Sequence, residues 1–271
     1  MFKTRLFSGA ILVVILAAFL VLGGDVLLVG LTLVSMIGLY EWLRMLKCEK
    51  SALAWVGYIG TVLHYVFTRF NVFKVFALEV QWVLLMAFLM IIMLTVYVFK
   101  FPKYKPTDIF GVLFGFVYVS IFLSYVYRTR MLTFGSWLVW LIFIVSWGCD
   151  TSAYCVGMLF GKHKMAPQLS PKKSIEGAIG GIVGTMLLTG LYLFLITKFT
   201  AFEFERTAIL VLLSGVAAFV SMIGDLAASA FKRQCDCKDY GTLIPGHGGI
   251  LDRFDSVIFV SPIVFYFLAF L

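Results

Sequence analysis

Residues 207–228 read TAILVLLSGVAAFVSMIGDLAA, an apolar run interrupted by a single acid, Asp225. This run is long enough to cross a bilayer as a helix, which takes about 20 residues. The next stretch, 229–256, reads SAFKRQCDCKDYGTLIPGHGGILDRFDS, and a second apolar run, 257–271, follows it. Charges beside membrane segments are costly unless they are paired, bind a metal or line a wet cavity. The stretch therefore predicts a functional site next to membrane helices.

The composition of the whole chain also indicates a membrane protein. Of its 271 residues, 62% are hydrophobic and only 13% are charged, whereas a soluble domain has about a quarter charged residues. No long polar stretch or linker divides the chain. We predict an all-α, polytopic transmembrane helix bundle in one continuous membrane domain, with N-terminal helices in 1–130 and the region that carries the site in 131–271.

Apolar segments of membrane-spanning length recur along the sequence. We expect about nine spans, and eight or ten remain open because the Gly23-Gly24-Asp25 break separates the first two and the last span is short. The N-terminal Met1-Phe2-Lys3-Thr4-Arg5 could open a signal peptide, but no cleavage site follows, which favours a retained helix. The predicted spans are 7–22, 26–43, 51–68, 79–99, 108–127, 134–154, 178–197, 207–228 and 257–271.

The distribution of Lys and Arg predicts the orientation of these spans. With a cytoplasmic N-terminus, 16 of the 22 basic residues lie on the cytoplasmic side, and the other 6 include Lys74 and Arg206. This is the bias that cytoplasmic loops show. The net charge of +8 has two possible interpretations. It reflects such flanks alone, or it also attracts the protein to anionic lipid headgroups. No soluble basic face is present, so we expect no nucleic-acid binding.

Three carboxylates in the C-terminal region predict a cation site. Asp252 and Asp255 are three positions apart and share one face of a helix. Asp225 begins a polar stripe that continues at Ser229, Lys232 and Arg233 on an otherwise apolar helix. Oxygen ligands alone favour a hard cation such as Mg²⁺, which binds one or two carboxylates together with substrate phosphates. The alternative is that these acids only pair with neighbouring bases and stabilise the bundle.

His247 stands between glycines, where the backbone can approach a ligand closely. It could donate to a phosphate, act as a general base, or simply brace the turn. Cys235-x-Cys237 lacks the spacing of a zinc pair, and the odd count of 5 cysteines gives no disulfide framework. We expect free thiols.

Two ordered blocks of residues between about 150 and 256 resemble the signature of phosphatidate cytidylyltransferases, also called CDP-diacylglycerol synthases. Two positions depart from the family's usual pattern: Ser174-Ile175 stands where Thr-Trp is common, and Met158 stands where Arg is common. The residues that carry the resemblance are Asp150-x-x-Ala153-Tyr154, Gly157, Phe160-Gly161-Lys162, Ser170-Pro171-Lys172-Lys173-Ser174-Ile175-Glu176-Gly177, Gly224-Asp225, Ser229-x-x-Lys232-Arg233, Lys238-Asp239, Pro245-Gly246-His247-Gly248-Gly249 and Asp252-Arg253-x-Asp255.

The resemblance implies an enzyme of phospholipid biosynthesis that converts CTP and phosphatidic acid to CDP-diacylglycerol and pyrophosphate, with Mg²⁺ as cofactor and room for a second cation. It implies catalytic roles for Asp225, Lys232, Arg233, Lys238, Asp239, His247, Asp252, Arg253 and Asp255, and metal binding by Asp225, Asp252 and Asp255. It implies substrate binding by Asp150, Ser170, Lys172, Lys173, Glu176, Ser229, Gly246, Gly248 and Gly249. We expect an integral protein of a bacterial cytoplasmic membrane, surrounded by membrane lipids, with its active site facing the cytoplasm; a homodimer is compatible with this.

Three other functions are distinguishable from this one. A CTP-dependent polyprenol or dolichol kinase would release CDP instead of pyrophosphate. A CDP-alcohol phosphotransferase would need its D-G-x-x-A-R…G-x-x-x-D-x-x-x-D run, which is absent from this sequence. A transporter of anionic solutes would show broken spans in paired halves, whereas the polar residues here gather in the C-terminal half.

Overall fold

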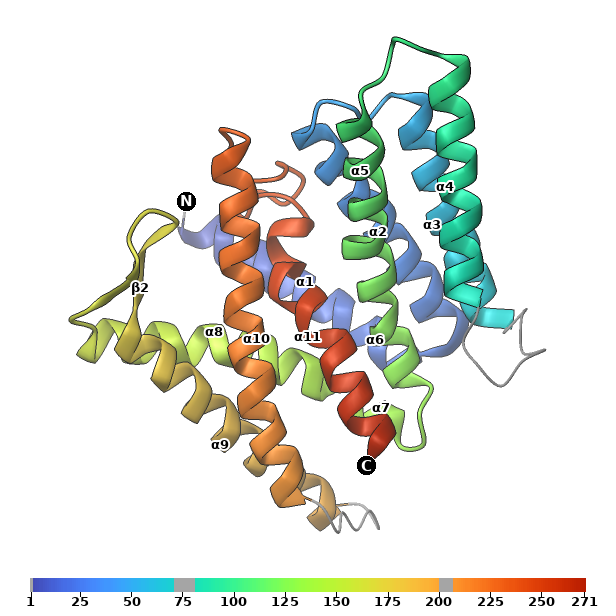
Figure 1. Ribbon diagram of the computed structural model, residues 1–271. Helices are drawn as coiled ribbons and strands as arrows, with labels where there is room; N and C mark the ends of the chain where they lie inside the picture. Colours follow the sequence, from blue (N-terminus) through green and yellow to red (C-terminus); the bar gives the residue numbers. More distant parts are fainter. Residues whose placement is uncertain (1, 71–80, 200–206) are drawn as a thin grey trace. The chain divides into compact units, whose positions relative to one another are not determined.

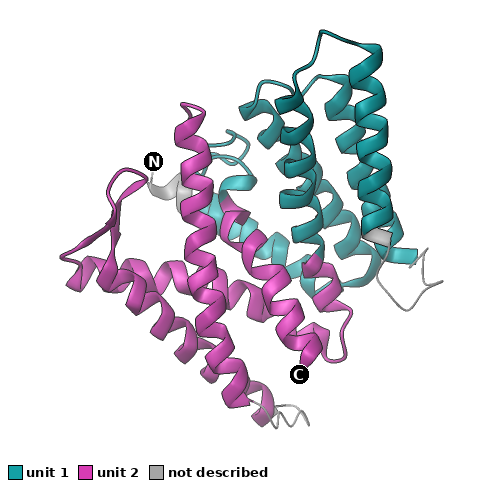
Figure 2. Ribbon diagram, viewed as in Figure 1, with its two compact units in different colours: residues 1–124, 239–252 teal, residues 125–238, 253–271 magenta. Residues whose placement is uncertain are grey.

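The computed structural model describes residues 2–70, 81–199 and 207–271 (Figure 1). Lys74 and Arg206, two of the basic residues used to predict the orientation, lie outside the described residues. The chain forms two compact units (Figure 2). Unit 1 comprises residues 1–124 and 239–252, and unit 2 comprises 125–238 and 253–271.

Unit 1 is built from the N-terminal helices together with the loop that precedes the last helix. The glycine break predicted after the first span is confirmed: α1 ends at Leu22 and α2 begins at Gly24, and Gly23 and Gly24 both have positive φ, which glycine adopts without strain. The helical elements of unit 1 are α1 (Phe2–Leu22), α2 (Gly24–Met45), α3 (Ala52–Phe70), α4 (Gln81–Phe99), α5 (Pro106–Gly115), the π-helix η1 (Phe116–Ile121) and the start of α6 (Phe122–Arg130).

Unit 2 contains the remaining helices and a short hairpin. Its elements are the rest of α6, α7 (Gly135–Leu138), α8 (Trp140–Phe160), β1 (Lys164–Ala166), β2 (Ser170–Ser174), α9 (Ile175–Phe199), α10 (Thr207–Gln234) and most of α11 (Leu251–Phe270).

Small residues allow α8 and α9 to pack closely. A Cβ atom at Gly180 would overlap Val156, and one at Gly184 would overlap Ser152. At Gly177 a Cβ atom would lie 2.8 Å from the Ala153 carbonyl oxygen. Small residues spaced four apart are a common way for membrane helices to approach each other. The glycines of α9 thus hold it against α8, and both helices contribute to the cavity described below.

The helical, membrane-embedded architecture agrees with the sequence prediction. Six segments in the described part of the chain are long and apolar enough to cross a membrane: 24–45, 106–130, 135–160, 175–198, 207–234 and 251–270. Shorter apolar helices occupy 7–22 and 83–99. The number of spans, about nine, stays a prediction.

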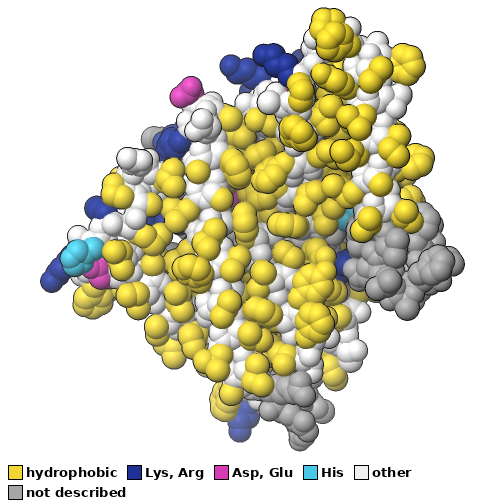
Figure 3. All heavy atoms as spheres, in the orientation of Figure 1, with side chains coloured by type: hydrophobic (Ala, Val, Ile, Leu, Met, Phe, Trp, Pro, Cys, Tyr) yellow, Lys and Arg dark blue, Asp and Glu magenta, His cyan; other side chains and the backbone are white. Residues whose placement is uncertain are grey.

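The outward surfaces of these helices suit a lipid environment. On α10 the exposed side chains include Leu212, Val216 and Phe219, which recur at helical spacing on one face. Hydrophobic side chains cover most of the surface visible in Figure 3. Exposed apolar faces of this extent are expected where the solvent is lipid.

The β-hairpin is the one departure from an all-α chain among the described elements. Strands β1 and β2 pair antiparallel, with Lys164 opposite Ser174 and Ala166 opposite Ser170. This hairpin carries the Ser170-Pro171-Lys172-Lys173 segment of the family resemblance. Pro167 and Pro171 interrupt any alternating pattern, so strand pairing was not predictable from periodicity.

Candidate functional site

A cavity of about 470 Å³ opens within unit 2. Its walls come from α8, the hairpin, α9 and α10, and they combine a charged group of side chains with an apolar one. The lining residues are Asp150, Ala153, Tyr154, Gly157, Met158, Met165, Ser170, Lys172, Lys173, Ser174, Gly177, Ala178, Met222 and Asp225. This volume suits a small-molecule site.

The cavity brings together predicted site residues from both sequence blocks. Asp150 comes from α8, Lys173 from β2 and Asp225 from α10. The Lys173 ammonium forms an ion pair with Asp225 Oδ2, and both side chains are only about a quarter exposed (26% and 25%). This ion pair links the two blocks of sequence that carry the predicted site residues.

Asp255 adds a further carboxylate to the charged residues of unit 2. It is buried, and Ser256 N donates to its Oδ1 at 2.8 Å. Asp225, Asp150 and Lys232 are near enough to act electrostatically on Asp255. Three acids grouped in this way repel one another unless cations lie among them.

Each acid of this group has a basic residue near it: Lys173 pairs with Asp225, and Lys232 acts electrostatically on Asp255. Arg253 acts electrostatically on Asp150, and its backbone oxygen accepts a hydrogen bond from Trp147 Nε1 at 3.4 Å. The helix α10 runs to Gln234, so the predicted stripe of Asp225, Ser229 and Lys232 lies on one continuous helix. Cations among acids are the arrangement expected of a phosphate-binding site.

Glu176 braces the hairpin that carries Lys173. Its carboxylate accepts hydrogen bonds from Lys162 N at 3.1 Å and from His163 N at 3.2 Å. It also lies 2.6 Å from His163 Nδ1. These contacts tie the first turn of α9 to the end of α8 and thereby fix both ends of the hairpin.

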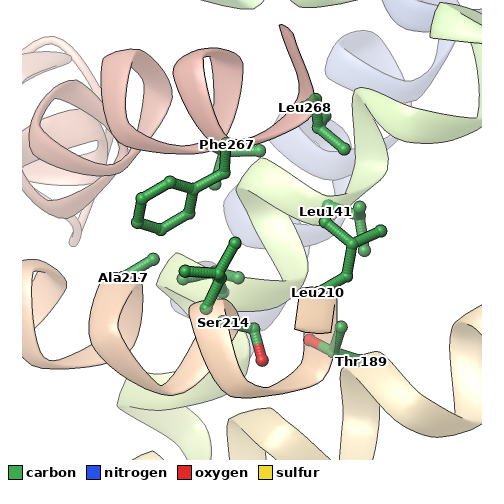
Figure 4. A pocket seen from close by; sticks show the side chains of 10 residues that line it. Leu141, Thr189, Leu210, Ser214, Ala217, Phe267 and Leu268 are labelled. Atoms are coloured by element: carbon green, nitrogen blue, oxygen red, sulfur yellow. The ribbon is translucent and has the colours of Figure 1, made fainter. Parts of the chain in front are cut away.

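A second pocket in unit 2 has a different character. Its volume is about 20 Å³, roughly what one water molecule needs. Leu141, Leu210 and Phe267 project into it from α8, α10 and α11 (Figure 4). It has no charged lining, and we assign it to packing between these helices.

In unit 1 the glycine-rich segment forms a compact turn. Ile244 N donates to the Gly248 carbonyl at 2.8 Å, and His247 N donates to the Ile244 carbonyl at 2.9 Å. Gly246 and Gly248 have φ values of 77° and 86°, in the left-handed region that glycine tolerates. The turn predicted around His247 is therefore present.

Asp252 holds together the two ends of the loop 239–250, which contains this turn and leads into α11. Its Oδ2 atom accepts hydrogen bonds from Tyr240 N at 2.8 Å and from Gly249 N at 2.9 Å. The side chain is 6% exposed. As predicted, Asp252 and Asp255 both lie in a helix, three positions apart near the start of α11.

The N-terminal helices hold the same loop through two side chains that the sequence did not single out. Glu41 of α2 accepts hydrogen bonds from Ile250 N at 3.0 Å and from Leu251 N at 2.8 Å. Ser8 of α1 donates to the Pro245 carbonyl at 3.0 Å and lies 2.8 Å from His247 Nδ1.

The Ser8 contacts select a tautomer of His247. A carbonyl oxygen only accepts, so the single Ser8 hydroxyl proton points to Pro245. Both hydrogen bonds then form together only when His247 Nδ1 is protonated and donates a hydrogen bond to Ser8 Oγ. In a neutral ring this leaves Nε2 as the acceptor nitrogen.

The predicted site residues thus fall into two groups. Unit 1 holds Asp239, Gly246, His247, Gly248, Gly249 and Asp252. Unit 2 holds Asp150, Ser170, Lys172, Lys173, Glu176, Asp225, Ser229, Lys232, Arg233, Lys238, Arg253 and Asp255. Of the latter, Asp150, Ser170, Lys172, Lys173 and Asp225 line the cavity.

Sequence reasoning missed the apolar wall of the cavity. Met222 lies three positions before Asp225 and so shares its face of α10, a spacing that could have identified it. Tyr154 and Met158 lie in the segment that carries the family resemblance but were not assigned to the site, and Met165 gave no signal beyond its apolar character. Glu41 was detectable as an acid within an apolar membrane helix, which marks a functional candidate by default.

All five cysteines are free thiols, as predicted. In the described part of the chain, no three His, Cys, Asp or Glu side chains gather in a way that would by itself hold a metal ion. Mg²⁺ does not need such a cluster, because substrate phosphates and water complete its coordination. The oxygen-only donors Asp225 and Asp255 fit that cation.

Comparison with known proteins relates the whole chain to one family. The model of the "Cytidylyltransferase family" matches residues 3–271. The chain is 30% identical over 271 residues to the phosphatidate cytidylyltransferase of Bacillus subtilis, covering 98% of this chain and 97% of that protein. It is 32% identical over 263 residues to the protein of the same name from Staphylococcus haemolyticus, with 97% of each chain covered. The phosphatidate cytidylyltransferase of Haemophilus influenzae is 29% identical over 284 residues, with 98% of each chain covered.

Proposed function

Because the chain belongs to the cytidylyltransferase family, we propose that it is a membrane phosphatidate cytidylyltransferase, which converts CTP and phosphatidic acid to CDP-diacylglycerol and pyrophosphate. The observation that carries this function is the cavity of unit 2, where Asp150, Lys173 and Asp225 meet beside an apolar wall. A charged end suits phosphates and an apolar wall suits acyl chains. The surrounding helices are apolar on their outer faces, so the membrane around them can supply the lipid substrate.

The reaction forms one bond and breaks one. An oxygen of the lipid phosphate attacks the α-phosphorus of CTP, and the bond from that phosphorus to the bridging oxygen of the β-phosphate breaks, releasing pyrophosphate. A phosphomonoester is largely ionised at neutral pH because its second pKa is about 6. The nucleophile therefore needs no general base, and His247 need not remove a proton.

Positioning and charge neutralisation are what the protein must supply for phosphoryl transfer. Lys172 and Lys173 on the hairpin bind phosphate oxygens at the cavity. Lys232, Arg233 and Arg253 add positive charge from α10 and α11, and the two Arg side chains can bind paired oxygens. The buried Met222 excludes water from the apolar side, and Tyr154 and Met158 extend the apolar wall toward the outer surface of the unit.

Asp225 and Asp255 are the residues that would hold Mg²⁺ in unit 2, and Asp252 is a further candidate ligand at the start of α11. When bound, the cation neutralises negative charge on the phosphates of the reacting substrates. Without a cation, these carboxylates would repel a triphosphate. The resemblance leaves room for a second cation in the same site.

The proposal also includes the surroundings of the enzyme. The apolar runs of the sequence support about nine spans. The Lys and Arg distribution supports an N-terminus and an active site on the cytoplasmic side of a bacterial inner membrane. A cysteine introduced at Lys164, in a chain whose own cysteines are replaced, should resist impermeant thiol reagents in intact cells; labelling there would reverse the orientation. Membrane lipids surround the protein, and light scattering in detergent would test whether it forms a homodimer.

Product analysis tests the function. Purified protein incubated with labelled CTP, phosphatidic acid and Mg²⁺ should form a CDP-lipid and pyrophosphate in equal amounts. Formation should stop on chelation of the cation and return when Mg²⁺ is restored. Folded protein that makes no CDP-lipid would refute the proposal, and release of CDP together with a phosphorylated lipid would indicate a lipid kinase.

A further inference from the structure

Glu41 places a carboxylate in an apolar helix, α2, where burial alone would be costly. The residue is 3% exposed. Burying a charge is unfavourable unless hydrogen bonds replace the lost water. Both carboxylate oxygens have such partners: Oε1 accepts from Ile250 N and Oε2 from Leu251 N. These donors lie 209 and 210 positions further along the chain, so the contact joins distant parts of unit 1.

The contact lies at the point where α11 begins. The first N–H groups of a helix have no acceptor within the helix, and most helices satisfy one with a polar side chain at the position before the first turn. Here that position is Ile250, which has no side-chain acceptor. Glu41 supplies the missing acceptors from α2, and its negative charge suits the positive end of the helix dipole.

Two glycines make room for the Glu41 carboxylate. A Cβ atom at Gly241 would overlap Glu41 Oε1, and one at Gly249 would overlap the same carboxylate group. Glycine at these positions thus lets the backbone of the loop approach Glu41 from two sides. Gly249 was predicted to allow close approach of substrate, and the close approach seen within unit 1 is to Glu41.

We propose that Glu41 is a positioning residue of the reaction, which fixes the loop 239–250 and the start of α11 and thereby sets the direction of the Asp252 carboxylate. The backbone donors that hold Asp252, Tyr240 N and Gly249 N, belong to the loop that Glu41 holds. Glu41 itself does not contact substrate. The inference rests on the proposed function to the extent that Asp252 belongs to the active site.

Amide hydrogen exchange tests the contact without depending on the reaction. In Glu41→Ala the amides of residues 250 and 251 lose their acceptors, and we expect them to exchange at least about tenfold faster than in the wild type. Glu49→Gln is the matched control, because Glu49 lies just beyond the same helix and outside the predicted site; its exchange should match the wild type. Unchanged exchange in Glu41→Ala would overturn the proposal.

Kinetics test positioning. Glu41→Ala should lower kcat per folded molecule by about 10- to 100-fold, the loss expected when charge-assisted hydrogen bonds are removed, with the KM for CTP within about twofold. Glu41→Gln keeps one carbonyl acceptor and should lose less. A kcat equal to that of Glu49→Gln, or a loss that only tracks the folded fraction, would overturn the positioning role.

Gly241 provides an independent geometric test. Gly241→Ala should lower kcat in the wild-type background because its Cβ displaces Glu41, and should add little in Glu41→Ala, where that clash is absent. Additive effects would contradict the geometry. If the amides of residues 250 and 251 exchange more slowly in the wild type than in Glu41→Ala, but the wild type makes no CDP-lipid, the proposed function fails. The contact between Glu41 and the loop is then still supported.

Discussion

The polar residues of the two units are used in different ways. In unit 1, Glu41, Ser8 and Asp252 bind the backbone of one loop and leave it tightly held. In unit 2, Asp150, Lys173 and Asp225 line an open cavity, and Lys173 forms an ion pair with Asp225. Hydrogen bonds to backbone fix geometry, whereas charges around a cavity are available to a ligand. We therefore expect unit 1 to act mainly by holding its loop in place, and unit 2 mainly by presenting charge to a ligand.

Asp225→Asn tests that division most strongly. It removes the charge that pairs with Lys173 and the carboxylate predicted to hold Mg²⁺. We expect kcat to fall by about a thousandfold, at the upper end of what loss of one stabilising charge costs. Turnover per folded molecule, with folding checked by size-exclusion chromatography, measures the effect.

Asp236→Asn is the control for Asp225→Asn, because Asp236 is an exposed acid in the loop that follows α10. It should retain the wild-type kcat. Retained activity in Asp225→Asn would remove this residue from the metal site and break the contrast between the units.

Lys173→Gln should give a smaller and different effect. Loss of one phosphate-binding ammonium should raise the KM for one substrate by about tenfold, as for a charge-assisted hydrogen bond, and leave kcat closer to the wild type. Lys164→Gln is the matched control, since Lys164 is exposed on the paired strand and does not line the cavity. Steady-state kinetics with CTP and phosphatidic acid varied separately would show which substrate Lys173 binds. An unchanged KM for both would exclude Lys173 from phosphate binding.

The helices were the most predictable part of the molecule. An apolar run of membrane-spanning length has few alternatives to a helix, because every backbone group must be hydrogen-bonded within the segment. The Gly23-Gly24 break was predictable for a similarly local reason. The polar stripe on α10 also followed from spacing alone, which put Asp225 and Lys232 on one helix.

Contacts between distant residues were not predictable in the same way. The sequence identified Lys173 and Asp225 separately, through motif residues, but nothing in their spacing showed that they would pair. Glu41 itself was detectable, but its contact was not, because its partners are backbone amides about 200 positions away, which leave no side-chain pattern. Local patterns specify elements, whereas these pairings depend on how the elements pack.

Ser8→Ala is expected to have the smallest effect and tests whether unit 1 acts through geometry alone. The change removes the acceptor that orients the His247 ring and the donor to Pro245 but leaves every charge of unit 2 in place. Of the two hydrogen bonds, only the one to His247 orients the ring, and a neutral hydrogen bond contributes about 1 kcal/mol, so kcat should fall by roughly fivefold. Ser8→Thr keeps a hydroxyl and should restore most of the loss. If Ser8→Ala instead reduced kcat as severely as Asp225→Asn, the His247 ring would have to take part in the chemistry, and the assignment of unit 1 to positioning would be wrong.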